Sequence, residues 1–308
     1  MEMSKHNVLI IGGNGFIGSN LGKHLADLGW SVTSFDIARP PMPDSRVEYV
    51  MGDFFDDNVL SEVIKGRDII YHALSTINPG NSNEKYMMGY GRDFIQTVKL
   101  FDMLKETDTK LIFLSSGGTV YGVQDKQPIT EEAPRKPINH YGNVKVCIEN
   151  TLRIFDIQAK SKMMIARISN PYGPGQDYRK GVGFIDAVLR KTIEGERVEI
   201  WGDGENVRDY IYIEDVCRML GVLADYSGEE TVFNLSSGTG TSQKQIMEIV
   251  KKIDDSVMCE YKPARSVDVR KIILDNSKIR KICPGELMGI EEGIRSVYDY
   301  LKGIRGKI

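Results

Sequence analysis

Short apolar runs alternate with longer amphipathic segments along the first half of the chain. The runs are rich in Val, Ile and Phe, as is typical of strands that are buried on both faces of a parallel sheet. The segments between them place apolar residues at helical spacing. We expect strands at residues 8–11, 32–35, 47–50, 68–72, 111–115 and 163–168, and helices at 15–28, 57–64, 86–105 and 141–155. This alternation predicts an α/β fold in which helices cover both faces of a parallel sheet.

The alternation loosens after Asn170 and Pro171, where glycine-rich turns separate shorter elements. We therefore expect a doubly wound, Rossmann-type domain over residues 1–171 and a smaller C-terminal α/β lobe over 172–308. Residues 208–216 look like a further strand and the start of a helix. We expect the segment around 208–220 to return to the first domain, so that the two parts interleave.

Charge and composition exclude several classes of protein. The 308 residues include 40 Lys and Arg and 43 Asp and Glu, which gives a net charge of −3. A nucleic-acid or membrane-surface protein would carry a basic excess, so we expect neither partner. Glycine is enriched, with 31 residues, and its positions give the first indication of function.

The cysteines and the N-terminal segment favour a cytoplasmic protein. Its first apolar run breaks at Gly12, too early for a signal peptide or a membrane span. Cysteines 147, 217, 259 and 283 lie far apart, which favours reduced thiols over a disulfide framework. The four histidines are equally scattered, so we expect no metal site.

The segment VLIIGGNGFIGSNL reads as a buried strand, a glycine turn and a helix start. Its spacing, Gly12-x-x-Gly15-x-x-Gly18, provides a tight turn, a close backbone approach to a pyrophosphate and close packing of helix on strand. A purely structural turn would also use glycines. However, Asp36 lies at the end of the second predicted strand, where an acidic side chain can hydrogen-bond the ribose hydroxyls of a dinucleotide. We expect a dinucleotide here. Asp36 favours NAD over NADP, although Arg39 lies nearby.

Tyr141 and Lys145 lie four residues apart, on one face of a predicted helix. A free tyrosine has a pKa of about 10 and is a weak base at neutral pH. A neighbouring ammonium, together with the positive charge of a nicotinamide, would favour the phenolate and lower that pKa. The pair alone could be an ordinary surface pair, but it follows a glycine fingerprint and a strand that ends in a hydroxyl-rich turn.

Several motifs occur in a fixed order along nearly the whole chain. They are GGNGFIGSNL, VMGDFFD, LSSGGTVYG, YGNVK, RISNPYGPGQ, WGDGENVRDYIYIEDV, FNLSSGTGTS and LDNSKIRKI. The ordered set resembles the extended short-chain dehydrogenase/reductase family and, within it, the UDP-glucose 4-epimerase-like enzymes that act on nucleotide sugars. Any single motif could arise by chance, whereas the set is highly specific.

The resemblance implies a role for particular residues. Tyr141 would take the proton of a sugar hydroxyl while hydride passes to NAD, and Lys145 would hold the nicotinamide ribose. Asn170 would lie at the sugar or phosphate end of the substrate, Arg208 would neutralise its diphosphate, and Arg265 would bind near the nucleotide. The residues implied at the cofactor are Gly12, Asn14, Gly15, Phe16, Ile17, Gly18, Asp36, Asp53, Phe54, Leu74, Tyr141 and Lys145.

Gly117 is the main departure from the family pattern, which usually has Ser or Thr at this position to hydrogen-bond the reacting hydroxyl. Ser116 or Thr119 could replace that hydroxyl, a water could fill the gap, or the glycine could admit a different substrate pose. We favour a substitute hydroxyl and count Ser116 and Thr119 with the catalytic residues.

Two further departures concern reaction type and charge. The family's 4,6-dehydratases carry an Asp-Glu pair where this chain has Gly118 and Thr119, and its decarboxylases usually carry a Glu there, so we expect neither reaction. Asp93 stands where the resemblance implies an Asn near the nicotinamide. Either a carboxylate there stabilises oxidised NAD, or the motif is shifted by one position.

The expected function is that of an NAD-dependent 4-epimerase acting on a nucleotide-linked hexose, UDP-glucose/galactose or the N-acetyl forms, through a 4-keto intermediate. The alternative is a 4-ketoreductase in deoxysugar synthesis, which would use the same Tyr, Lys and cofactor. A catalytically silent nucleotide-sensing protein is a third hypothesis, supported only by Gly117. The resemblance also implies a homodimer, formed through the helices expected at 86–105 and 141–155.

Overall fold

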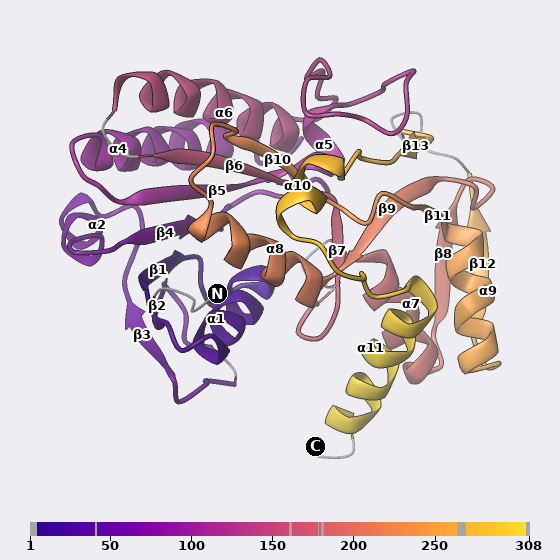
Figure 1. Cartoon of the computed structure of the whole chain (residues 1–308). Helices are drawn as coiled ribbons and strands as arrows, with labels where there is room; N and C mark the ends of the chain where they lie inside the picture. The colour runs from indigo at the N-terminus through magenta and orange to yellow at the C-terminus, as the bar shows by residue number, and fades with distance from the viewer. Residues whose placement is uncertain are drawn as a thin grey trace.

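A seven-stranded parallel sheet forms the larger part of the molecule (Figure 1). The computed structural model describes residues 5–40, 42–159, 162–177, 179, 182–263 and 269–305. The sheet has the order β10-β6-β5-β4-β1-β2-β3, with all neighbours parallel. Its strands are β1 Asn7–Ile11, β2 Ser31–Asp36, β3 Val47–Met51, β4 Ile69–His72, β5 Lys110–Ser116, β6 Met163–Ile168 and β10 Val232–Leu235. The predicted strands and the doubly wound fold are confirmed.

Helices cover both faces of this sheet, as predicted. On one face lie α1 Phe16–Asp27, α8 Ile213–Asp225 and α10 Ser277–Ile282; on the other lie α2 Asp57–Val63, α4 Ile95–Leu104 and α6 His140–Gln158. Figure 1 shows α4 and α6 together above the sheet and α1 and α8 below it. Strand residues Val8 to Ile11 have no exposed surface, and burial of each such side chain contributes about 1.5–3 kcal/mol.

The helix predicted over 86–105 is present without a break, but it is not α-helical throughout. It consists of α3 Tyr86–Met88, the π-helical turn η1 Gly89–Phe94 and then α4. A π-turn accommodates an extra residue, so side chains after it point in a different direction from those of a regular helix. In η1 this places Asp93, which is polar, in the interior with 3% of its surface exposed.

Shorter sheets form the remainder of the molecule, on the right of Figure 1. In one sheet β9 Val207–Tyr212 lies between β11 Gly240–Ser242 and β13 Lys271–Ile272, and β7 Asn170–Tyr172 also pairs with β9. β8 Arg197–Trp201 and β12 Met258–Lys262 form a two-stranded sheet. A separate apolar core joins these strands to α7 Phe184–Glu194, α9 Gln243–Ile253 and α11 Ile290–Arg305.

The chain passes repeatedly between the two parts. After β7 and β9 in the small sheet, α8 packs on α1, β10 joins the edge of the large sheet beside β6, and β11 returns to β9. The boundary near residue 171 stays a prediction, and α8 and β10 beyond it belong to the layers of the large sheet. No helix in the described part of the chain is long and apolar enough to cross a membrane.

Candidate active site

A cavity of about 880 Å³ opens at the carboxyl ends of the central strands β1, β4 and β5. In a doubly wound sheet this is where the strand order reverses and where ligands bind. One wall comes from the turn between β1 and α1, and the opposite wall comes from β7, β9 and α7. The cavity therefore lies between the large sheet and the smaller part of the molecule.

The glycine turn gives the first wall its shape. Gly12 has φ +76°, and a Cβ there would lie 2.8 Å from the backbone nitrogen of Leu74. A Cβ on Gly18 would lie 2.6 Å from the carbonyl oxygen of Gly12. The turn thus brings bare backbone to the cavity beside the N-terminus of α1, whose cap residue Gly15 offers no side-chain hydrogen bond. This cradle suits the pyrophosphate of a dinucleotide.

The predicted cofactor residues fall into two groups. Gly12, Gly15, Phe16, Ile17 and Gly18 line the cavity, whereas Asn14, Asp36, Asp53, Phe54 and Leu74 lie outside its lining. Asn14 locks the turn: its Oδ1 accepts a 2.7 Å hydrogen bond from Ser34, and its backbone N–H donates to Asp36 over 3.2 Å. Asp36 and Asp53 nevertheless stand at the carboxyl ends of adjacent strands, where an adenosine would extend from the turn.

Tyr141 and Lys145 lie one turn apart on α6, as predicted. Tyr141 lines the cavity, while Lys145 is 4% exposed and its Nζ donates a 3.1 Å hydrogen bond to the carbonyl of Leu114. Lys145 Nζ lies 5.6 Å from the centre of the Tyr141 ring. Burial lowers the pKa of Lys145 to about 8, against the opposing effect of Asp93 and Glu149.

The environment of Tyr141 favours its neutral form. Burial raises the pKa of Tyr141 to about 12, a hydrogen bond with Ser116 acts in the opposite direction, and the charge of Asp93 raises it further. The lowering of this pKa that we expected from Lys145 is not found: desolvation of the phenol is the largest effect on the pKa, and Ser116 is the group that acts against it.

Gly117 does not line the cavity. A Cβ at this position would lie 2.4 Å from Cδ1 of Leu274 and 3.1 Å from the carbonyl oxygen of Arg167, so a serine there would point into the core. Gly118, the next residue, does line the cavity and faces Asn170. A missing hydroxyl at 117 therefore does not by itself leave a gap beside Tyr141.

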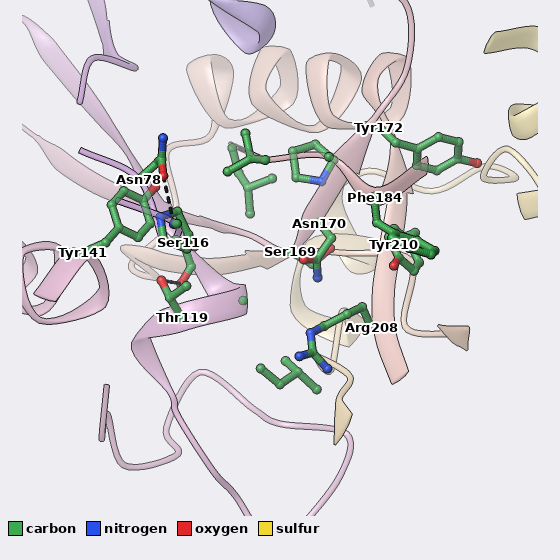
Figure 2. A pocket seen from close by; sticks show the side chains of 18 of the residues that line it. Asn78, Ser116, Thr119, Tyr141, Ser169, Asn170, Tyr172, Phe184, Arg208 and Tyr210 are labelled. Carbon is green, nitrogen blue, oxygen red and sulfur yellow. Dashed lines mark hydrogen bonds between the residues drawn. The ribbon is translucent and has the colours of Figure 1, made fainter. Parts of the chain in front are cut away.

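Ser116 and Thr119 both line the cavity, near Tyr141 (Figure 2). Ser115, the remaining hydroxyl of the turn, donates a 2.6 Å hydrogen bond to the buried carboxylate of Glu149. Thr119 Oγ1 donates over 3.4 Å to the carbonyl of Ser116, whereas the Ser116 side chain hydrogen-bonds Tyr141. The contacts favour Ser116 as the hydroxyl that accompanies Tyr141.

Asn170 and Arg208 lie on the opposite wall. Figure 2 shows them beside Phe184 and Tyr210, across from the group that contains Tyr141. Asn170 Nδ2 donates over 3.2 Å to the carbonyl of Asp209 on β9. Arg265, the other predicted substrate residue, lies outside the described residues.

The sequence did not single out the loop after β4 or the charged cluster behind the site. Ser75 and Asn78 line the cavity, and Asn78 stands next to Ser116 and Tyr141 in Figure 2. Behind β5, Arg167 pairs with Glu149 over 2.7 Å, and both side chains are almost fully buried. The Asn-Pro-Gly run at 78–80 was a turn signal that could have identified the loop, but the ion pair joins elements that are distant in sequence.

Comparisons with known proteins agree with this geometry. A family model described as the NAD dependent epimerase/dehydratase family matches residues 8–236. The dTDP-4-dehydro-6-deoxyglucose reductase of Escherichia coli is 32% identical over 291 residues, which are 89% of this chain and 90% of that protein. The structure of UDP-glucose 4-epimerase from Thermotoga maritima with UDP-glucose is 30% identical, with a TM-score of 0.90 and coverage of 97% and 99%. That of Thermus thermophilus UDP-glucose 4-epimerase with NAD is 25% identical, with a TM-score of 0.87 and coverage of 96% and 99%.

Proposed function

The chain belongs to the NAD-dependent epimerase/dehydratase family, and on this premise we propose that it inverts carbon 4 of a nucleotide-linked hexose through a 4-keto intermediate. The observation that carries the proposal is that one cavity joins three parts: the bare backbone turn at Gly12, the Tyr141 and Ser116 pair, and Arg208 on the far wall. These parts suit, in that order, NAD, a sugar hydroxyl and a diphosphate.

Tyr141 acts as the base that removes the proton from the hydroxyl on carbon 4, and Ser116 donates a hydrogen bond that favours the phenolate. Lys145 places a cationic group beneath the Tyr141 ring. NAD held at the glycine turn of Gly12, Gly15 and Gly18 would supply the acceptor, and then the donor, of the hydride on carbon 4. Tyr141 then returns the proton, so the sugar leaves with its configuration inverted and no net oxidation.

Arg208 binds the diphosphate of the substrate, and Asn170 lies at its sugar or phosphate end. A guanidinium binds phosphate oxygens in pairs. Among the residues that the structure describes, Arg208 is the cationic side chain that lines the cavity. The Thermotoga maritima relative was solved with UDP-glucose, which supports a UDP-linked sugar. Arg265, which lies outside the described residues, stays a sequence-based prediction for binding near the nucleotide.

The test gives the purified protein UDP-galactose, UDP-N-acetylgalactosamine or UDP-glucuronate without added cofactor, with products separated by chromatography. We expect interconversion of at least one sugar with its 4-epimer. The Tyr141→Phe variant should lose about 10²–10⁴-fold in kcat while retaining NAD, because only the acid–base group is removed. Absence of any interconversion, or full activity of Tyr141→Phe, contradicts the proposal.

A 4-ketoreductase is the second candidate, supported by the 32% identity to the Escherichia coli reductase. A reductase runs one hydride transfer and must exchange its cofactor after each turnover, whereas an epimerase regenerates its cofactor in place. NAD that copurifies in near-stoichiometric amount favours the epimerase. Protein that purifies without it, and that reduces dTDP-4-dehydro-6-deoxyglucose with NADH, favours the reductase.

We also propose that two copies associate through α4 and α6, in the cytoplasm. The outer sides of the adjacent helices α3, α4 and α6 expose Met87, Ile95 and Ile154, and the cysteines, all four of them described, are free thiols. Light scattering should give the mass of a dimer. A double variant, Ile95→Glu with Ile154→Glu, should give a monomer, and a wild-type monomer contradicts the proposal.

A further inference from the structure

Asp93 is a buried carboxylate directly behind the cavity. It lies on the π-helical turn η1 with 3% of its surface exposed, and it is not part of the cavity lining. A buried ionised carboxylate is stable only where donors or cations compensate for the lost hydration. The neighbours of Asp93 therefore indicate what it does.

Three hydrogen bonds to the Asp93 carboxylate come from the loop after β4. Its Oδ2 accepts from the backbone N–H of Thr76 over 2.8 Å and from Ser75 Oγ over 3.0 Å. Its Oδ1 accepts from Thr76 Oγ1 over 2.6 Å. Ser75 is part of the cavity wall, so Asp93 fixes this section of the wall from behind.

The charge of Asp93 faces the catalytic pair. Among the described residues Asp93 takes part in no ion pair, whereas Glu149, the other acid that acts on Lys145, pairs with Arg167 over 2.7 Å and with Arg135 over 3.2 Å. The cations of two arginines thus offset the charge of Glu149. No such ion pair offsets the effect of Asp93 on the buried ammonium of Lys145 among the described residues.

Several elements packed around Tyr141 and Lys145 carry other titratable or charged side chains. These are His72 on β4, Arg167 on β6, His140 and Glu149 on α6, and Tyr90 on η1. Burial lowers the pKa of His72 to about 3, so it is neutral at physiological pH. His140 hydrogen-bonds Tyr90 over 3.1 Å on the outer side of α6. None of these supplies Lys145 with an unpaired negative charge.

We propose that Asp93 is a positioning residue that fixes the Ser75 and Thr76 section of the cavity wall and balances the charge of Lys145. The inference rests on the proposed function, because it assigns Asp93 an influence on the protonation of the catalytic residues Tyr141 and Lys145. Asp93 raises the pKa of both Tyr141 and Lys145, so each group holds its proton more tightly. A nearby negative charge holds that proton to higher pH.

This arrangement suits a reaction that both takes and returns a proton. Burial lowers the pKa of Lys145 and so favours loss of its proton. The charge of Asp93 opposes that effect, so Lys145 holds its proton to higher pH and stays cationic beside Tyr141 while the phenol oxygen takes the proton of the sugar hydroxyl and later returns it.

The test compares Asp93→Asn with the wild type. Asparagine has the same shape, its amide oxygen accepts from Thr76 N–H, and its NH₂ group donates to the Thr76 hydroxyl, so only the charge is lost. Protein carrying ¹³Cε-lysine is titrated by NMR without substrate, and the Lys145 signal is identified by its absence in Lys145→Arg. We expect a midpoint near pH 8 in the wild type and one lower by roughly 1 unit in Asp93→Asn.

Thr76→Val is the matched control, because it removes one donor to Asp93 and leaves the charge. It should lower thermal stability and leave the Lys145 midpoint unchanged. Asp93→Ser, which is smaller and also neutral, should reproduce the lower midpoint if Asp93→Asn does not fold. An unchanged Lys145 midpoint in a folded neutral variant overturns the inference.

The acidic limb of kcat/KM should move to lower pH in Asp93→Asn along with the NMR midpoint. A purely structural role would change KM or stability and leave both pH values in place. If no nucleotide sugar is turned over, the NMR titration still measures the charge effect, so failure of the proposed function is distinguishable from failure of this inference.

Discussion

The two walls of the cavity are built in different ways. The cofactor wall consists of backbone from one continuous segment, in which Gly12 and Gly18 leave no room for a Cβ. The substrate wall consists of side chains from separate elements, such as Asn170 on β7, Phe184 on α7 and Arg208 on β9. Backbone geometry is common to all members of a fold, whereas side chains on several segments can change singly. We infer that the first wall fixes the cofactor and the second selects the substrate.

The largest effect should come from Gly12→Ala. The positive φ and the 2.8 Å approach to the Leu74 backbone leave a methyl group no space, so the turn must open. We expect loss of copurifying NAD and a fall in activity of at least about 10³-fold, because the hydride acceptor is absent.

Gly29→Ala is the control for Gly12→Ala. Gly29 also has a positive φ, of +78°, but no atom lies within 4 Å of its Cβ position. It should lose about 1 kcal/mol of stability and keep its NAD. If both variants retain NAD equally, the cofactor wall does not depend on bare backbone.

Ser116→Ala should lower kcat by about 10²–10³-fold with NAD binding unchanged, because it removes the donor next to Tyr141. Adding Gly117→Ser to this variant should not restore activity, since a side chain at 117 meets Leu274 and points away from the cavity. Steady-state kinetics on both variants checks this. Rescue by the second substitution would place the hydroxyl at 117 after all.

Arg208→Gln should raise KM for the nucleotide sugar about 10–100-fold, as expected for lost charge-assisted hydrogen bonds to a diphosphate. NAD binding should be unaffected, because Arg208 lies on the other wall. Arg153→Gln removes an exposed arginine of α6 and should leave KM unchanged. Equal loss of affinity for both ligands in Arg208→Gln would remove the distinction between the walls.

The smallest expected effect is that of His72, behind the cofactor wall, on the pH dependence of the protein's stability. His72 at the end of β4 is 1% exposed, and burial lowers its pKa to about 3. In the unfolded chain it binds a proton below pH 6.5, so stability falls as the pH drops from there towards 3, by about 1 kcal/mol per pH unit. Melting temperatures measured between pH 7 and 5 should fall less steeply in His72→Gln. Identical slopes would show that other groups control acid sensitivity.

Sequence predicted the cofactor wall well because its signals are local. Strands such as β1 are buried on both faces and appear as continuous apolar runs, and the glycine spacing follows directly. Tyr141 and Lys145 could be placed together because helix geometry fixes their separation. Local geometry does not show which residue of the turn after β5 faces the cavity and which faces the core. Gly117 was therefore expected beside the substrate, although it faces Leu274.

The substrate wall and the charges behind the site needed the tertiary structure. Asn78 and Ser75 reach the cavity on a loop whose path no periodicity defines. Asp93 turns inward because of a π-turn, which an apolar pattern does not distinguish from a regular helix. The pairing of Glu149 with Arg167 depends on the contact of α6 with β6.

The repeated passage of the chain between the two parts has a mechanical consequence. The substrate wall is tied to the large sheet by several backbone connections, among them those between β6 and β7, between β9 and α8, and between β10 and β11. If one part moved away from the other, all these connections would have to bend together. A motion about a single hinge is therefore not expected. We therefore expect the width of the cavity to stay nearly constant. Under the proposed function, a sugar that presents first one face and then the other would then rotate about its own bonds to the diphosphate.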